Sequence, residues 1–134
     1  MLDIAYDTKV EPREVKSPGP KPVVWMGDSR ETLRGFPQAV REKIGFALYE
    51  AQMGEKHVDA KPLRIFGPGI LEIVSDHRGD TFRAVYTVRL AGRVYVLHTF
   101  QKKSKTGIAT PKADMELVKR RLKRAAEIHA TLER

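Results

Sequence analysis

The chain has 134 residues, a formal net charge of +8 at pH 7 and no cysteine. This length suits one domain with a hydrophobic core and is too short for two. The lack of cysteine excludes disulfides, thiolate metal sites and cysteine nucleophiles. No apolar run approaches the ~20 residues that span a bilayer, and the N-terminal residues lack the apolar centre of a signal peptide. We therefore expect a cytoplasmic protein without a membrane segment.

Residues 1–21 are expected to form a flexible tail in front of a single domain that spans residues 22–134. Prolines interrupt this segment, the run SPGP at residues 17–20 is typical of a linker, and apolar residues are sparse. A short apolar strand is predicted over residues 23–26, and Gly27 and Asp28 end it.

Two helices are predicted after this strand. Asp28 or Ser29 is suited to cap a short helix that runs to Leu33 and ends at Gly35. Pro37 suits the first turn of a second helix, for which Gly54 is the natural end. The apolar residues of the second helix follow helical spacing, and they are Val40, Ile44, Ala47, Leu48 and Ala51.

Three strands and a last helix follow a polar connection over residues 55–69. The strands are expected over residues 70–75, 82–90 and 93–100, with turns at residues 76–80 and 91–92. Alternation groups His98 and Phe100 with Val96 on one face of the last strand. The last helix is expected to begin at Thr110. The predicted order is β-α-α-β-β-β-α, which indicates an α+β fold with two N-terminal helices packed on a small, mainly antiparallel sheet.

Positive charge is concentrated between residues 78 and 105. This stretch holds seven basic residues and one acid, and it therefore contributes +6 of the net charge. Alternation puts Arg83 on the face opposite Phe82 and Ala84. The loop after the last strand brings lysines toward it, and these are Lys102, Lys103 and Lys105. With few acidic residues nearby, the cluster predicts a rigid anion site, and nucleic acid is the most abundant polyphosphate. The alternative is a solvent-facing Arg83 on a one-sided sheet beside a solubilising loop.

The four histidines lie in separate predicted elements, and neither HxxxH nor HExxH spacing occurs. The sequence therefore predicts no metal site. His98 alternates with core residues, which is typical of a buried, hydrogen-bonded histidine. His77 stands in a turn beside Arg78, and it is the candidate for proton transfer because histidine side chains titrate near neutral pH.

The element order and several motifs resemble the RelE/ParE superfamily of toxins from toxin–antitoxin modules, and within it the phage-derived, Gp49-like HigB branch. The resemblance extends from about Lys21 to Glu127. It rests on KPLR at residues 61–64, LEI at residues 71–73 and FRAVY at residues 82–86. Its most specific part is LHTFQKKSKT at residues 97–106, followed by the helix start at Thr110 and Pro111.

This resemblance implies a RelE-like fold and, as in RelE and HigB members, metal-independent cleavage of mRNA on the ribosome without a cofactor. It implies catalytic roles for Arg83 and for Lys103 or Lys102. The implied partner is a small HigA-like antitoxin with a helix-turn-helix DNA-binding domain. Further basic residues are candidates for binding RNA phosphates, and they are Lys61, Arg64, Arg78, Lys105 and Arg89.

The chain also departs from the pattern of RelE-like proteins. Relatives often carry a lysine on the strand before the strand arginine, where this chain has Glu72 and Val74. Ile108 and Ala109 occupy the region of an expected tyrosine. The sequence therefore assigns no general acid or base. Two alternatives stay open, which are a non-enzymatic inhibitor of DNA gyrase, as ParE-like relatives are thought to be, and a basic RNA-binding module without catalysis.

Overall fold

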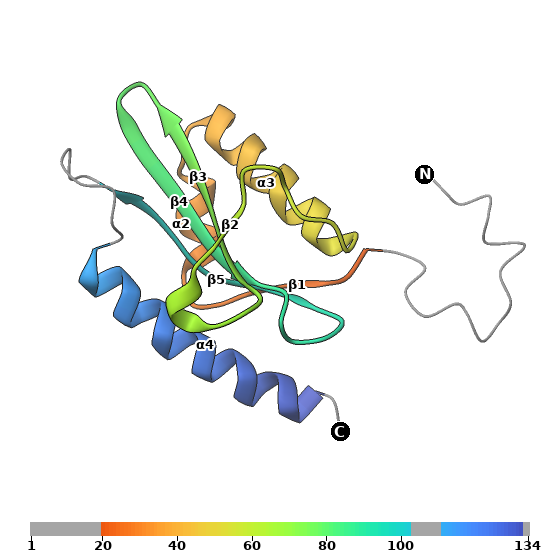
Figure 1. The fold of residues 1–134 in the computed structure, drawn as a ribbon. Helices are drawn as coiled ribbons and strands as arrows, with labels where there is room; N and C mark the ends of the chain where they lie inside the picture. Colours follow the sequence, from red (N-terminus) through yellow and green to blue (C-terminus); the bar gives the residue numbers. More distant parts are fainter. Residues whose placement is uncertain (1–19, 103–110, 133–134) are drawn as a thin grey trace, which may run out of the picture.

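The computed structural model describes residues 20–102 and 111–132, which fold into a five-stranded sheet with helices on both faces (Figure 1). The elements in chain order are β1 (Val23–Trp25), α2 (Ser29–Arg34), α3 (Gln38–Gln52), β2 (Lys61–Pro62), the 3-10 helix η2 (Arg64–Phe66), β3 (Ile70–His77), β4 (Asp80–Thr87), β5 (Val94–Lys102) and α4 (Lys112–Leu132). The strand order is β1-β5-β4-β3-β2, with β1 parallel to β5 and the other pairs antiparallel. The predicted α+β class and element order are confirmed, and β2 and η2 are additions within the expected connection.

Each face of the sheet has its own hydrophobic core. On the face that α2 and α3 cover, called here the α3 face, residues such as Ile44 and Val40 pack against Phe82 and Tyr86. The opposite face, called the α4 face, is covered by α4 (Figure 1). Val118 of this helix belongs to the core on this face. Because both faces are covered, side chains of both parities along β4 are buried. The sheet is therefore two-sided, and a buried charge on it requires a specific partner.

The β3–β4 hairpin is longer and tighter than the sequence predicts. The strands continue through the expected turn to the pair His77–Asp80, so that only Arg78 and Gly79 form the connection. Both have positive φ, 53° and 86°, as a two-residue hairpin turn of the primed type requires. At its other end β4 stops at Thr87 and not at residue 90. There Gly69 O accepts hydrogen bonds from the Thr87 hydroxyl and from Val88 N, which replace further strand pairing.

A β-bulge in β5 changes which side chains share a face. Val85 pairs with His98 and the next residue, Tyr86, pairs with Val96, so Leu97 is an extra residue in β5. Beyond the bulge, the side-chain parity of β5 is reversed. The prediction that His98 and Phe100 share a face with Val96 is therefore wrong. Phe100 packs in the α4-face core with Leu97, whereas Val96 packs in the α3-face core.

The helix ends differ from the prediction in their capping. Asp28 is the N-cap of α2, but its side chain makes no capping hydrogen bond and instead pairs with Arg121 of α4. Pro37 is the N-cap of α3 and precedes the first turn. Gly35 ends α2 as expected, and Gly54 follows the Met53 C-cap of α3 with φ of 83°.

Candidate functional site

The centre of the α4 face holds a buried ion pair between neighbouring strands. Arg83 of β4 and Glu72 of β3 are each 7% exposed, and Arg83 Nη1 lies 3.1 Å from Glu72 Oε2. Val74 is opposite Arg83 and Val85 is opposite Glu72, so the pair crosses the ladder diagonally. Arg83 is on the face opposite Phe82 and Ala84, as predicted. The expectation that few acids lie nearby is wrong, because Glu72 shares this face and compensates the buried guanidinium.

Two lysines share the face of this pair. Lys102 is at the end of β5, 6% exposed, and pairs with Thr81, two residues from Arg83 along β4. Lys61 of β2 is exposed and lies opposite Glu72. Directly opposite residues of antiparallel strands project to the same side, so strand register brings Lys61, Glu72, Arg83 and Lys102 to one face. Lys103 and Lys105, also predicted for this site, lie outside the described residues.

The structure separates other predicted residues from the pair. Arg89 lies just after the C-terminal end of β4, whereas Lys102 pairs near the N-terminal end of that strand. The Nη1 of Arg89 donates a hydrogen bond to Phe66 O. The structure therefore does not bring Arg89 to the ion pair, and its predicted binding of an RNA phosphate stays a prediction. Arg64 is exposed in η2, beyond the end of β2, so the described geometry does not bring it to the ion pair.

The hairpin turn presents its predicted residues away from the ion pair. Arg78 is exposed at the tip, beyond the end of the ladder. His77 lies an odd number of residues from Glu72 along β3, and side chains alternate between the two faces along a strand. His77 is therefore directed to the α3 face, whereas Arg83 is on the α4 face. This placement does not support the prediction that His77 transfers a proton at the Arg83 site.

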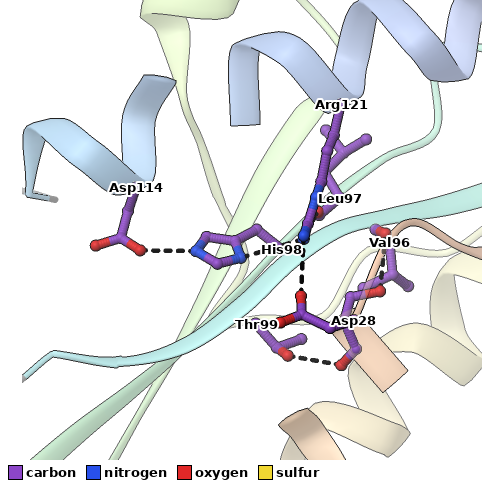
Figure 2. A network of polar contacts seen from close by, with 8 residues as sticks. Asp28, Val96, Leu97, His98, Thr99, Asp114 and Arg121 are labelled. Carbon is purple, nitrogen blue, oxygen red and sulfur yellow. Dashed lines mark hydrogen bonds and ion pairs between the residues drawn. The ribbon is translucent and has the colours of Figure 1, made fainter. Parts of the chain in front are cut away.

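A chain of polar contacts joins β5, α4 and the loop before α2 (Figure 2). His98 is 7% exposed, its Nε2 lies 2.7 Å from Asp114 Oδ1, and its Nδ1 lies 3.4 Å from Arg121 Nη1. Because a guanidinium only donates, Nδ1 is assigned as the acceptor and Nε2–H as the donor to Asp114. His98 also stacks on Phe100, with ring centroids 4.7 Å apart. The prediction that His98 is a buried, hydrogen-bonded histidine is confirmed.

Arg121 is the hub of this chain of contacts. Its Nη1 donates to Leu97 O at 3.0 Å, and its Nη2 donates to Asp28 Oδ1 at 2.9 Å (Figure 2). The hydrogen bond from Arg121 is the main cause that lowers the pKa of Asp28 below its usual value. Gly27 has φ of 55° and passes so close to the guanidinium that an added Cβ would lie 2.6 Å from Arg121 Cζ. The positive φ favours a glycine at residue 27, and a larger residue there would also displace the Arg121 guanidinium.

The α4 face is suited to hold a phosphodiester. Arg83 is a permanent cation with a planar fork of donors, Lys102 adds a compact charge on the same face, and Glu72 is a carboxylate paired with Arg83. Within residues 20–102 and 111–132, no group of three or more histidine or acidic side chains could hold a metal ion. The described part of the chain also contains no helix with the length and apolarity to cross a membrane.

Sequence reasoning missed the position of Glu72. The signal was present, because Glu72 and Arg83 both lie in strands and a tight hairpin at residues 78–79 fixes their register. The sequence analysis expects a longer turn over residues 76–80, which does not determine the register between the two strands. Asp114 and Arg121 carried no comparable signal, since their partners lie in β5 and before α2, far away in sequence.

Comparisons with known proteins agree with this architecture. A sequence model of the family described as "Phage derived protein Gp49-like" matches residues 31–123. No curated protein matches the chain. Its fold is similar to that of a mutant of the E. coli toxin RelE in the free state, with a TM-score of 0.50 and 17% identity over 79% of this chain and 98% of that one.

A second solved structure is the RelBE2 toxin–antitoxin complex from Mycobacterium tuberculosis. The match has a TM-score of 0.43 and 20% identity, and it covers 63% of this chain and 94% of that chain. The predicted RelE-like fold is confirmed by the likeness to RelE. Since the family match spans more than half of the residues, the chain belongs to the phage-derived Gp49-like family.

Proposed function

We propose that this protein is the toxin of a type II toxin–antitoxin module and that it cleaves mRNA on the ribosome, which stops translation. The observation that carries the proposal is the buried Arg83–Glu72 pair beside Lys102 on the α4 face. A largely buried arginine on a strand is held in place for a phosphate, and its carboxylate partner is proposed as the base that the sequence left unassigned. The RelE-like fold and membership of the Gp49-like family support the same proposal.

The proposed reaction needs no metal ion. The ribose 2′-oxygen attacks the adjacent phosphorus while Glu72 takes the 2′-hydroxyl proton, and the bond from phosphorus to the 5′-oxygen breaks. The products are a 2′,3′-cyclic phosphate and a 5′-hydroxyl end, whose proton comes from a nearby ammonium group or water. Arg83 and Lys102 stabilise the charge that builds up on the phosphoryl oxygens. Lys103 is proposed to assist them, as the family resemblance implies.

Induced expression and purified protein together test this proposal. Expression without antitoxin is expected to arrest growth with cleaved mRNA, and Arg83→Ala is expected to relieve both effects. Purified Arg83→Ala should cleave RNA at least about 10²-fold more slowly, the typical cost of losing a stabilising donor. Arg124→Ala is the matched control, because it removes the same charge from an exposed arginine of α4 that pairs with Glu127 on the same helix.

A second variant separates catalysis from folding. Glu72→Gln keeps a hydrogen-bond acceptor for Arg83 and removes the base, so RNA binding should persist while the 2′,3′-cyclic phosphate product is lost. Growth arrest that survives Arg83→Ala with intact mRNA would contradict the proposed site. If DNA synthesis stops before translation after induction, the protein is instead a gyrase inhibitor.

The proposed partner is a small antitoxin with a helix-turn-helix domain, similar to HigA. Its gene is expected beside this one, and its co-expression should restore growth and co-purify with the toxin. Salt-sensitive RNA binding without any product would identify the third alternative, a binding module without catalysis.

A further inference from the structure

The bulge in β5 determines the face on which Lys102 lies. Val96 is on the α3 face, and simple alternation from it would place residues 98, 100 and 102 on that face as well. The extra residue Leu97 reverses this parity, so that Lys102 pairs with Thr81 on the face of Arg83. A strand that slips by one residue transfers every following side chain to the other face. The basic site therefore depends on a bulge that precedes Lys102 by five residues.

The bulge is held by Arg121. Arg121 Nη1 donates to the carbonyl oxygen of Leu97, the extra residue itself, and also contacts His98 Nδ1. Leu97 and His98 together oppose the single residue Val85, so both bulge residues contact one guanidinium. Figure 2 shows that these contacts converge on Arg121 from the strand, while Asp28 binds its other nitrogen.

The surrounding residues are arranged to keep this guanidinium in place. Arg121 is largely buried, with 16% of its side chain exposed, and the Gly27 backbone leaves no room for a Cβ beside it. On the α3 face the same stretch of β5 is fixed by Thr99, whose hydroxyl donates to Ser29 O, and by Val96 O, which accepts from Ser29 Oγ. Hydrogen bonds thus hold the bulge from both faces of the sheet, and Arg121 provides them on the α4 face.

We infer that Arg121 is a positioning residue for the candidate site: it fixes the β5 bulge and thereby keeps Lys102 on the face of Arg83. The consequence for RNA cleavage rests on the proposed function, whereas the placement of Lys102 does not. Arg121 acts through the strand and does not touch the phosphate. A purely structural role for Arg121 would instead anchor α4 without affecting Lys102.

The first test measures Lys102 directly and requires no enzymatic activity. Lys102 is buried in the native protein, so brief treatment with an amine-acylating reagent, read by peptide mass spectrometry, should modify it slowly. Arg121→Ala is expected to raise its acylation rate several-fold. Arg124→Ala is the matched control, because it removes the same charge from an exposed arginine of α4 that pairs with Glu127 on the same helix. If Lys102 is acylated as slowly in Arg121→Ala as in the wild-type protein, while the variant remains folded, the inference is overturned.

Two further variants guard against loss of folding in Arg121→Ala. Asp28→Asn weakens one anchor of the guanidinium at an exposed side chain, and it should give a smaller increase in Lys102 acylation. Gly27→Ala displaces the guanidinium without removing a charge, and it should act in the same direction as Arg121→Ala. If neither variant changes Lys102 while both remain folded, Arg121 has only the structural role.

The second test measures cleavage by the purified protein. Misplacement of Lys102 should lower kcat by about 10-fold or more with little change in KM, since a small misalignment of a catalytic group is costly. Arg124→Ala should keep the wild-type kcat, because its side chain is exposed and pairs with Glu127 on the same helix. If the wild-type protein cleaves no RNA, the proposed function fails, and the acylation result still decides the role of Arg121.

Discussion

At the scale of single residues, Tyr86 shows how the core restricts ionisation. Tyr86 is fully buried on the α3 face, and among the described residues its hydroxyl has no hydrogen-bond partner. Burial raises the pKa of Tyr86 to about 12, and the charge of Glu50 contributes in the same direction. The core therefore keeps this phenol neutral.

The Tyr86→Phe variant is expected to be as stable as the wild-type protein or more stable at pH 7, because it removes an unpaired buried hydroxyl. A folded pKa above the unfolded value of 10.0 gives stability that is present below pH 10 and is lost as pH rises toward about 12. Denaturant unfolding at pH 7 and between pH 10 and 12 measures this. The variant should lose less stability than the wild type over the alkaline range, and an equal loss would contradict the assignment.

Asp28 gives the opposite dependence at acid pH. Its folded pKa is lowered by Arg121, so the stability that it contributes is present above the unfolded value of 3.8 and is lost as pH falls. The carboxylate is mostly exposed, which limits the effect to roughly 1 kcal/mol or less. Asp28→Asn should flatten the fall in unfolding free energy below pH 4. A steeper fall in the variant would show that Arg121 does not stabilise this carboxylate.

At the scale of elements, α4 depends on a narrow apolar contact. Its fully buried residues are Val118 and Ala125, whereas Lys123 is exposed on the same helix. Val118→Ala should lower the free energy of unfolding by about 2 kcal/mol through lost burial and the cavity that remains. Lys123→Ala is the control and should change it by less than about 0.5 kcal/mol. Equal effects of the two substitutions in urea unfolding would contradict this docking of α4.

The element scale also shows what the sequence could and could not provide. Alternation over residues 82–87 predicted the two faces of β4, including that of Arg83, because both neighbours of Arg83 are apolar. The bulge at Leu97 carried no local signal, since no glycine marks it and each residue there is an ordinary strand former. The sequence predicts Lys61 as a phosphate-binding residue but does not predict its strand β2, because that strand contains only two residues and includes a proline.

At the scale of the whole molecule, the two faces of the sheet differ in composition. The α3 face holds an apolar core, while the α4 face combines an apolar core with the buried Arg83–Glu72 pair. The chain as a whole carries a formal net charge of +8, which favours association with polyanions. If the protein binds RNA as proposed, association should begin as a general electrostatic attraction and then be completed by contacts at the Arg83–Glu72 pair.

The whole-molecule charge predicts a strong dependence of RNA binding on salt. If six or more phosphates are contacted, the affinity should fall by about 10³-fold or more between 50 and 200 mM salt. Fluorescence anisotropy with labelled single-stranded RNA measures this slope. Arg83→Ala should reduce the slope by about one phosphate contact, whereas an affinity independent of salt would exclude the basic surface as the binding site.

The parallel pairing of β1 with β5 has a consequence for synthesis of the protein. Val23 pairs with Val94, and 71 residues separate them (94 − 23). At about 5–20 residues per second, β1 leaves the ribosome roughly 4–14 s before its partner strand. β5 also carries the bulge and Lys102 and lies between β1 and β4, so the sheet acquires this inner strand last. The nascent chain therefore carries no assembled basic site while most of it is being made, and the ribosome that produces it faces the finished site only at the end.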